Sequence, residues 1–255
     1  MKILLTNDDG IQSANIRKLA YALAEKGYDV SVFAPVSQKS ACSHSLTVHD
    51  FFSYSEERWE GITHAVAVSG SPADCVKFAV KFFGIKPDLV VTGPNEGCNL
   101  GTDVMYSGTV AGAMEGVICG YKAIALSVCG DKEQRMKPEK LIKFFVSNFD
   151  ELVANVPHYG ILNVNYPECG DAVGVKVTKT GKIFYTDYYE ERENDSIKTY
   201  KLRGETIFQT DDEEDCDVKF SQRGYITVSP LRVDKTDYEA LARMNELEKK
   251  LVLGE

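Results

Sequence analysis

The chain has 255 residues, of which 44% are hydrophobic and 26% are charged, as is typical of a globular protein with one large core. Its net charge of −9 argues against a polymeric nucleic-acid partner, which would require a basic surface. No apolar stretch approaches the roughly 20 residues of a membrane span, so we expect no membrane partner. The seven cysteines lack C-x-x-C spacing, and charged residues interrupt any N-terminal signal pattern, so we expect reduced thiols and a cytoplasmic location.

The first elements predict a β-α-β unit. A strand over 2–6 is followed by apolar residues at helical spacing, by Gly27 and by a second strand over 30–34. Further strands are predicted over 65–68, 88–92, 123–128 and 161–164, and further helices over 72–83, 107–118 and 138–153. This alternation predicts an α/β fold with a mostly parallel sheet and helices on both faces.

The pattern changes after Pro167. Short β-type runs alternate with turns over 173–229, which predicts hairpins that project from the main sheet. These runs contain many large apolar and aromatic side chains: Tyr185, Tyr188, Tyr189, Ile197, Tyr200, Ile207 and Phe208. Burial against a second copy of the chain would cover these side chains, although folding back onto the chain's own sheet is an alternative. A capping box at Thr236–Glu239 predicts a final helix whose apolar side includes Leu241 and Leu251.

Polar residues follow several of the predicted strands. Asp8 and Asp9 come directly after the first strand, a serine-rich loop over 35–47 follows the second, and Asn95 follows the strand over 88–92. Because the carboxyl ends of parallel strands meet at one sheet edge, these side chains should gather there. Two carboxylates, a hydroxyl and an amide oxygen suit Mg²⁺ or Mn²⁺.

A second motif, Ser107-Gly108-Thr109, opens a predicted helix and forms a typical anion cradle. A metal ion beside a phosphate cradle indicates phosphoryl transfer to water. Taken singly, each motif is more commonly a turn or a helix cap, so this interpretation depends on the loops meeting. His44 and His49 are either general acids or structural residues, and Asp103 and Tyr106 either face the site or cap a loop.

The motifs resemble those of the SurE family of stationary-phase survival proteins, which are metal-dependent nucleotidases. The resemblance covers nearly the whole chain. Its blocks include residues 3–11, Ala34-Pro35, Ser40, 44–47, 70–76, 87–91, Asn95, 99–101, 106–110, 224–231 and 236–238. It implies a Rossmann-like catalytic core over 1–170, a β-hairpin extension and oligomerisation segment over 171–230, and a C-terminal helix over 231–255.

The resemblance also implies the site. One divalent ion per subunit, Mg²⁺ or Mn²⁺, would bind Asp8, Asp9, Ser40 and Asn95, and phosphate would contact Ser107, Gly108 and Thr109. The expected activity is a phosphomonoesterase acting on nucleoside monophosphates, a 5'-nucleotidase with 3'-nucleotidase and exopolyphosphatase activity as further options. The catalytic residues would be Asp8 and Asp9. The nucleophile is either a metal-activated water or one of these aspartates. A homodimer or homotetramer is expected.

Some residues depart from the family pattern. Asn15 stands where glycine is usual, and we expect it to adopt the left-handed conformation that glycine would. Ala41 follows the ligand serine, Pro94 stiffens the approach to Asn95, and Glu96 adds an acidic group near the site. Two other functions remain as alternatives. One is a glycosyl- or nucleotidyl-transferase using the same metal site, and the other is a nucleotide-binding regulator without turnover.

Overall fold

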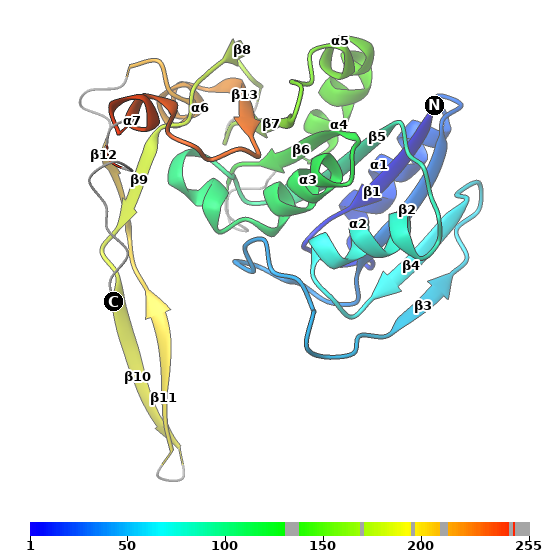
Figure 1. Ribbon diagram of the computed structural model, residues 1–255, viewed down its shortest axis with the longest axis horizontal. Coiled ribbons are helices and arrows are strands. Elements are labelled where there is room, and N and C mark those ends of the chain that lie inside the picture. Colours follow the sequence, from blue (N-terminus) through cyan, green and yellow to red (C-terminus); the bar gives the residue numbers. More distant parts are fainter. Residues whose placement is uncertain (131–137, 169–170, 195–196, 210–213, 245–246, 248–255) are drawn as a thin grey trace.

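The protein is described by a computed structural model over residues 1–130, 138–168, 171–194, 197–209, 214–244 and 247. One nine-stranded sheet dominates it (Figure 1). Its spatial order is β3 (Tyr54–Glu57), β4 (His64–Val68), β2 (Asp29–Pro35), β1 (Lys2–Thr6), β5 (Leu89–Glu96), β6 (Lys122–Val128), β7 (Gly160–Tyr166), β13 (Tyr225–Arg232) and β8 (Gly174–Val177). The six strands from β4 to β7 in this order run parallel, which confirms the predicted α/β fold.

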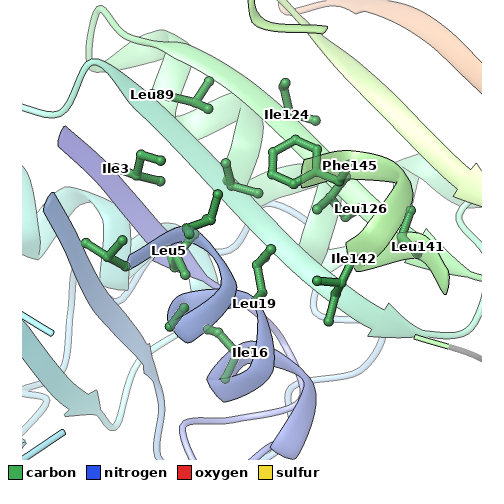
Figure 2. Packing of buried hydrophobic residues seen from close by; sticks show 14 of the residues in the cluster. Ile3, Leu5, Ile16, Leu19, Leu89, Ile124, Leu126, Leu141, Ile142 and Phe145 are labelled. Carbon is green, nitrogen blue, oxygen red and sulfur yellow. The ribbon is translucent and has the colours of Figure 1, made fainter. Parts of the chain in front are cut away.

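Helices cover both faces of the sheet. On one face, α1 (Ala14–Ala24), α4 (Pro138–Ser147) and α5 (Phe149–Ala154) pack against alternate strand residues such as Ile3 and Leu5 (Figure 2). On the other, α2 (Pro72–Lys81) and α3 (Gly108–Ile118) pack against Leu4, the intervening residue of the same strand. Since successive strand residues point to opposite faces, both faces of β1 must be apolar, as Ile3, Leu4 and Leu5 in its middle are.

The strand order reverses between β1 and β5. From β1 the chain moves outward through β2 to β4, and from β5 it moves the other way through β6 to β7. The crevice at the carboxyl ends of the strands on either side of such a reversal is the usual ligand site of an open α/β sheet. Here it lies between the turn after β1 and the end of β5.

Helix α3 lies unusually close to these two strands. A Cβ on Gly112 would be 2.9 Å from Thr92 Cγ2 and 3.1 Å from Thr6 Cγ2. The hydroxyl of Thr92 also donates to the carbonyl of Thr109 at 2.7 Å. Glycine on the inner side of α3 therefore lets the helix N-terminus reach the sheet edge where the crevice opens.

The segment over 171–230 divides between the sheet and a projecting ribbon. Strand β13 pairs antiparallel with β7 and parallel with β8. The first and last strands of this segment, β8 and β13, therefore extend the main sheet. Two hairpin pairs project from it: β9 (Lys182–Tyr185) with β12 (Thr206–Gln209), and β10 (Tyr188–Asn194) with β11 (Ile197–Arg203). Figure 1 shows the β10–β11 pair as the long tip of this ribbon. The projecting ribbon, from β9 to β12, thus includes fewer residues than the extension expected over 171–230.

Several elements differ from expectation. Strand β3 was not predicted, because its residues are mostly exposed and lack apolar alternation. The helix expected over 138–153 breaks at Asn148 into α4 and α5. Strand β5 continues through Pro94 to Glu96, and a six-residue helix, α6 (Asp217–Gln222), interrupts the C-terminal strands.

Two local expectations are wrong. Asn15 is helical, as the second residue of α1, and does not adopt the left-handed conformation. The final helix, α7 (Tyr238–Arg243), is capped by Asp237, which accepts from the amide of Ala240 at 2.8 Å, and not by Thr236. Leu251 and the rest of the helix expected beyond residue 247 lie outside the described residues. Within the described chain, no helix combines the length and apolar character needed to cross a bilayer.

Candidate active site

Asp8 sits at the carboxyl end of β1 and is held from two sides. Its side chain is only 6% exposed, and its Oδ1 accepts a hydrogen bond from the Thr109 hydroxyl at 2.5 Å. Its carbonyl accepts from the amide of Lys39 at 2.7 Å, which fixes the start of the serine-rich loop. Burial raises the pKa of Asp8, and the Thr109 hydrogen bond opposes this effect. A cation beside this carboxylate would offset the cost of its burial.

The other expected ligands lie around Asp8. Asp9 Oδ2 accepts from the amide of Glu96 at 3.3 Å, which joins the turn after β1 to the end of β5. Asn95 donates its side-chain NH₂ to the carbonyl of Gly97 at 2.8 Å, which leaves its Oδ1 as the atom for a cation. Ser40 is exposed, on the loop that Lys39 ties to Asp8.

A cavity of about 530 Å³ opens between these elements. Asp8, Ser40, Asn95 and Ser107 all line it, so the structure brings together three expected metal ligands and one cradle residue. Asp9 does not line the cavity. It accepts a hydrogen bond from the amide of Glu96, and Glu96 does line the cavity. Further wall residues are Ala41, Cys98, Asn99, Asp103, Tyr106, Tyr185, Asp187, Leu202, Arg203 and Gly204.

The start of α3 has the features of an anion site. Ser107 is its N-cap and accepts from the amide of Val110 at 3.0 Å, which leaves its hydroxyl proton for a ligand. The amides of the first turn, including those of Gly108 and Thr109, have no partners within the helix. Thr109 is fully buried and its hydroxyl bonds Asp8, so only its amide remains for a phosphate.

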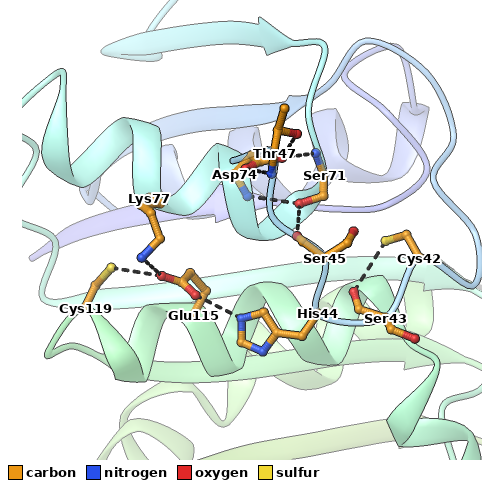
Figure 3. Close-up of polar contacts among 10 residues, drawn as sticks. All are labelled: Cys42, Ser43, His44, Ser45, Thr47, Ser71, Asp74, Lys77, Glu115 and Cys119. Carbon is orange, nitrogen blue, oxygen red and sulfur yellow. Dashed lines mark hydrogen bonds and ion pairs between the residues drawn. The ribbon is translucent and has the colours of Figure 1, made fainter. Parts of the chain in front are cut away.

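The loop that carries Ser40 is anchored to helix α2 (Figure 3). Asp74 accepts from both the amide and the hydroxyl of Thr47, at 3.0 and 2.7 Å. Ser71, the N-cap of α2, donates its hydroxyl to the carbonyl of Ser45 at 2.7 Å. Ala41 has a φ of 53°, an unfavourable value for a residue other than glycine, so these anchors hold the loop in a strained conformation.

A second anchor joins the loop to helix α3. Glu115 is 1% exposed and contacts both His44 Nε2, at 2.9 Å, and Lys77 Nζ, at 2.6 Å (Figure 3). Burial alone would raise the pKa of Glu115, but the hydrogen bonds from His44 and Lys77 outweigh it and lower the pKa. The contact with Glu115 makes His44 an anchor of this loop.

The ribbon also contributes to the site. Tyr185 donates its hydroxyl to Asp103 Oδ2 at 2.5 Å, and the amide of Ile183 donates to the Thr102 hydroxyl at 3.1 Å. These contacts dock β9 on the short helix η1 (Gly101–Met105), and Leu202 and Arg203 consequently reach the cavity wall. Sequence reasoning missed these ribbon residues as site components, because no local pattern pairs positions some 80 residues apart.

No three His, Cys, Asp or Glu side chains gather into a metal-binding group within the described residues. A cation here would therefore depend on the hydroxyl and amide oxygens of Ser40 and Asn95 as well as on the two aspartates. That all-oxygen set fits a hard divalent ion.

The fold and this site define a doubly wound α/β protein with an oxygen-donor centre beside a helix N-terminus. The family model for the survival protein SurE matches residues 3–187. The chain belongs to the SurE family.

Individual relatives match over almost their full length. A protein of Desulfitobacterium hafniense called 5'-nucleotidase SurE is 41% identical over 252 residues, which cover 96% of both chains. A protein of the same name from Caldanaerobacter subterraneus subsp. tengcongensis is 37% identical over 250 residues, covering 95% of this chain and 96% of the relative. The crystal structure of the SurE protein from Aquifex aeolicus matches with a TM-score of 0.80 and 35% identity, covering 97% of this chain and 100% of that one.

Proposed function

We propose that this protein is a metal-dependent 5'-nucleotidase, a phosphoric monoester hydrolase that converts nucleoside monophosphates to nucleoside and phosphate. The observation that carries the proposal is that Asp8, Ser40 and Asn95 line the same cavity as Ser107. The relatives that are called 5'-nucleotidase SurE, which match 95% and 96% of the chain, support it.

Asp8, Asp9, Ser40 and Asn95 would hold one divalent ion, with Mg²⁺ or Mn²⁺ favoured by the oxygen donors. Such an ion supplies Lewis-acid polarisation of the phosphoryl group and activation of water. Thr109 keeps Asp8 in place through its hydroxyl. Because Asp8 is buried and already bonded, it is better suited to a ligand role than to attack on phosphorus, so we favour water as the nucleophile.

The N-terminus of α3 would bind the substrate phosphate. The hydroxyl of Ser107 and the first-turn amides of Gly108 and Thr109 donate to its oxygens, and the helix dipole favours its negative charge. As charge develops on the phosphoryl oxygens, these fixed donors would stabilise the transition state without having to reorganise.

We also propose that the ribbon mediates assembly into a homodimer or a dimer of dimers. Tyr189, Tyr200 and Leu202 are each more than half exposed, and the strand register places them on one face of the β10–β11 pair. A two-stranded ribbon cannot bury such side chains by itself. A second copy of the chain is the simplest partner.

Phosphate release tests the function. Purified protein should release inorganic phosphate from 5'-nucleoside monophosphates when Mg²⁺ or Mn²⁺ is present, and excess chelator should abolish the release until metal is restored. Parallel assays with 3'-monophosphates and polyphosphate define the range of substrates. Release with no acceptor present rules out an obligatory transferase. Nucleotide binding without release would indicate a regulator and contradict the proposal.

A further inference from the structure

Glu96 lies on the cavity wall and is oriented by a buried asparagine. It is the last residue of β5, and Asn15 Nδ2 donates to its Oε1 at 2.9 Å. Asn15 is 5% exposed within α1, so this donor cannot move far. The amide of Glu96 bonds Asp9 in turn. Glu96 is exposed to solvent, and this hydrogen bond from Asn15 orients its carboxylate beside the proposed metal ligands.

The wall around Glu96 is strongly acidic. Four carboxylates line the cavity, those of Asp8, Glu96, Asp103 and Asp187, against a single cationic side chain, Arg203. The charge of Arg203 is already shared, because its Nε donates to Glu190 at 2.8 Å.

One divalent ion would offset the charges of Asp8 and Asp9 only. The remaining part of the cavity, around Glu96, Asp103 and Asp187, would stay negative when the ion is bound.

This charge distribution bears on the choice of substrate. A nucleoside monophosphate has one phosphate, which the metal and the α3 cradle can bind, and the rest of the molecule is neutral. A nucleoside diphosphate or an inorganic polyphosphate must place further negative charges in the same cavity. Like charges separated by several ångströms in a partly hydrated cavity repel one another appreciably.

Building on the 5'-nucleotidase function proposed above, we infer that Glu96, positioned by Asn15, is a specificity-determining residue. It discriminates against substrates that carry a second phosphoryl group, and so favours monophosphates over nucleoside diphosphates and inorganic polyphosphate. Its effect is electrostatic exclusion, so it need not touch the reacting atoms.

The test compares kcat/KM for a nucleoside monophosphate with kcat/KM for inorganic tripolyphosphate at fixed free Mg²⁺. Glu96→Gln should raise the ratio of tripolyphosphate to monophosphate hydrolysis by about three- to tenfold, and high salt should reduce this gain through screening. Asn15→Ala, which frees the carboxylate but keeps its charge, should give a smaller rise. Glu56→Gln makes the same change of charge on the exposed edge strand β3 and should leave the ratio unchanged.

Two further measurements keep the outcome decisive. Asp187→Asn removes another carboxylate of the wall and should shift the ratio in the same direction, which covers the case of a Glu96 variant that fails to fold. Calorimetric titration with tripolyphosphate should show tighter binding to E96Q than to wild type, whether or not turnover occurs. Wild-type protein without nucleotidase activity would contradict the proposed function, and the titration would still decide the inference. The inference would be overturned if Glu96→Gln and Asp187→Asn left the hydrolysis ratio and the tripolyphosphate affinity unchanged. Gains that salt does not reduce would overturn it as well.

Discussion

Gly108 and Asp8 are packed so closely that a Cβ on residue 108 would lie 3.0 Å from Asp8 Cβ. The same atom would lie 2.8 Å from Cys42 Sγ, on the loop that carries Ser40. The phosphate cradle, the buried carboxylate and the serine-rich loop therefore meet at a point where there is no room for a side chain. Their spacing depends on glycine at this position.

Gly108→Ala should accordingly separate these three elements. Overpacking at such a site costs about 1–3 kcal/mol of stability, and a displacement of about 1 Å in a catalytic site can reduce the rate by about 10²-fold. Gly174→Ala is the matched control, because its Cβ would make ordinary contact with Tyr225 at 3.4 Å. Steady-state phosphate release and thermal unfolding measure both effects. A wild-type rate in G108A would contradict this account of the packing.

Asp8→Asn should remove most of the activity and leave the metal-free protein equally or more stable at pH 7. Burial raises the pKa of Asp8 above its ordinary 3.8, so this group costs the fold stability as the pH rises from 3.8 through the raised value, and the full cost is present above it. The amide has no such cost and can still accept from Thr109. Any gain in Tm should disappear below pH 3.8, where the carboxyl is protonated in both folded and unfolded chains. A variant with nearly wild-type turnover would refute the ligand assignment.

The two partners of Glu115 should have separable roles. His44→Phe removes one of the contacts that anchor the Ser40 loop, and weakening such a supporting contact should raise the dissociation constant for Mn²⁺ by about tenfold. Lys77→Met removes the other contact, between α2 and α3, and should lower Tm while Mn²⁺ affinity stays near wild type. Paramagnetic resonance of free Mn²⁺ gives the affinity without nucleotide. Equal affinities in wild type and H44F would show that this contact serves stability alone.

The ribbon should control the oligomeric state. Replacing Tyr189 and Tyr200 by serine removes two exposed rings from one face of the β10–β11 pair without touching the sheet. Sedimentation velocity at micromolar concentration should then show a lower molar mass than for wild type. Lys198→Ser, on the same ribbon face, is a control for substitution itself. A wild-type protein that sediments as a monomer would exclude this assembly.

The central sheet was predictable because its strands and helices follow a single periodic pattern. Strand β1 has three consecutive apolar residues, Ile3, Leu4 and Leu5, and α1 repeats apolar residues at helical spacing, so neither has a competing structure. Strand β3 and helix α6 are short and weakly patterned, and their conformations depend on neighbours distant in sequence. The same holds for β13, whose place between β7 and β8 no local signal reveals.

The site was predictable only in part, for a similar reason. The order of strands places the turn after β1, the serine-rich loop and the end of β5 at one edge, and that much follows from a parallel sheet. Which side chains touch there does not follow from it. The Thr109–Asp8 hydrogen bond and the Asn15–Glu96 pair join residues about a hundred and about eighty positions apart, and both depend on how closely the helices approach the sheet.

The position of β13 has a consequence for synthesis on the ribosome. Strand β7 is buried along its whole length, but its outer hydrogen-bonding edge stays open until residues 225–232 have emerged and paired with it. Up to that moment the nascent chain presents an unpaired strand edge, the kind that pairs with other chains and aggregates. A ribosome that stalls while translating the ribbon would therefore leave a nearly complete chain that is prone to aggregate. The need for chaperones should be greatest over this late interval.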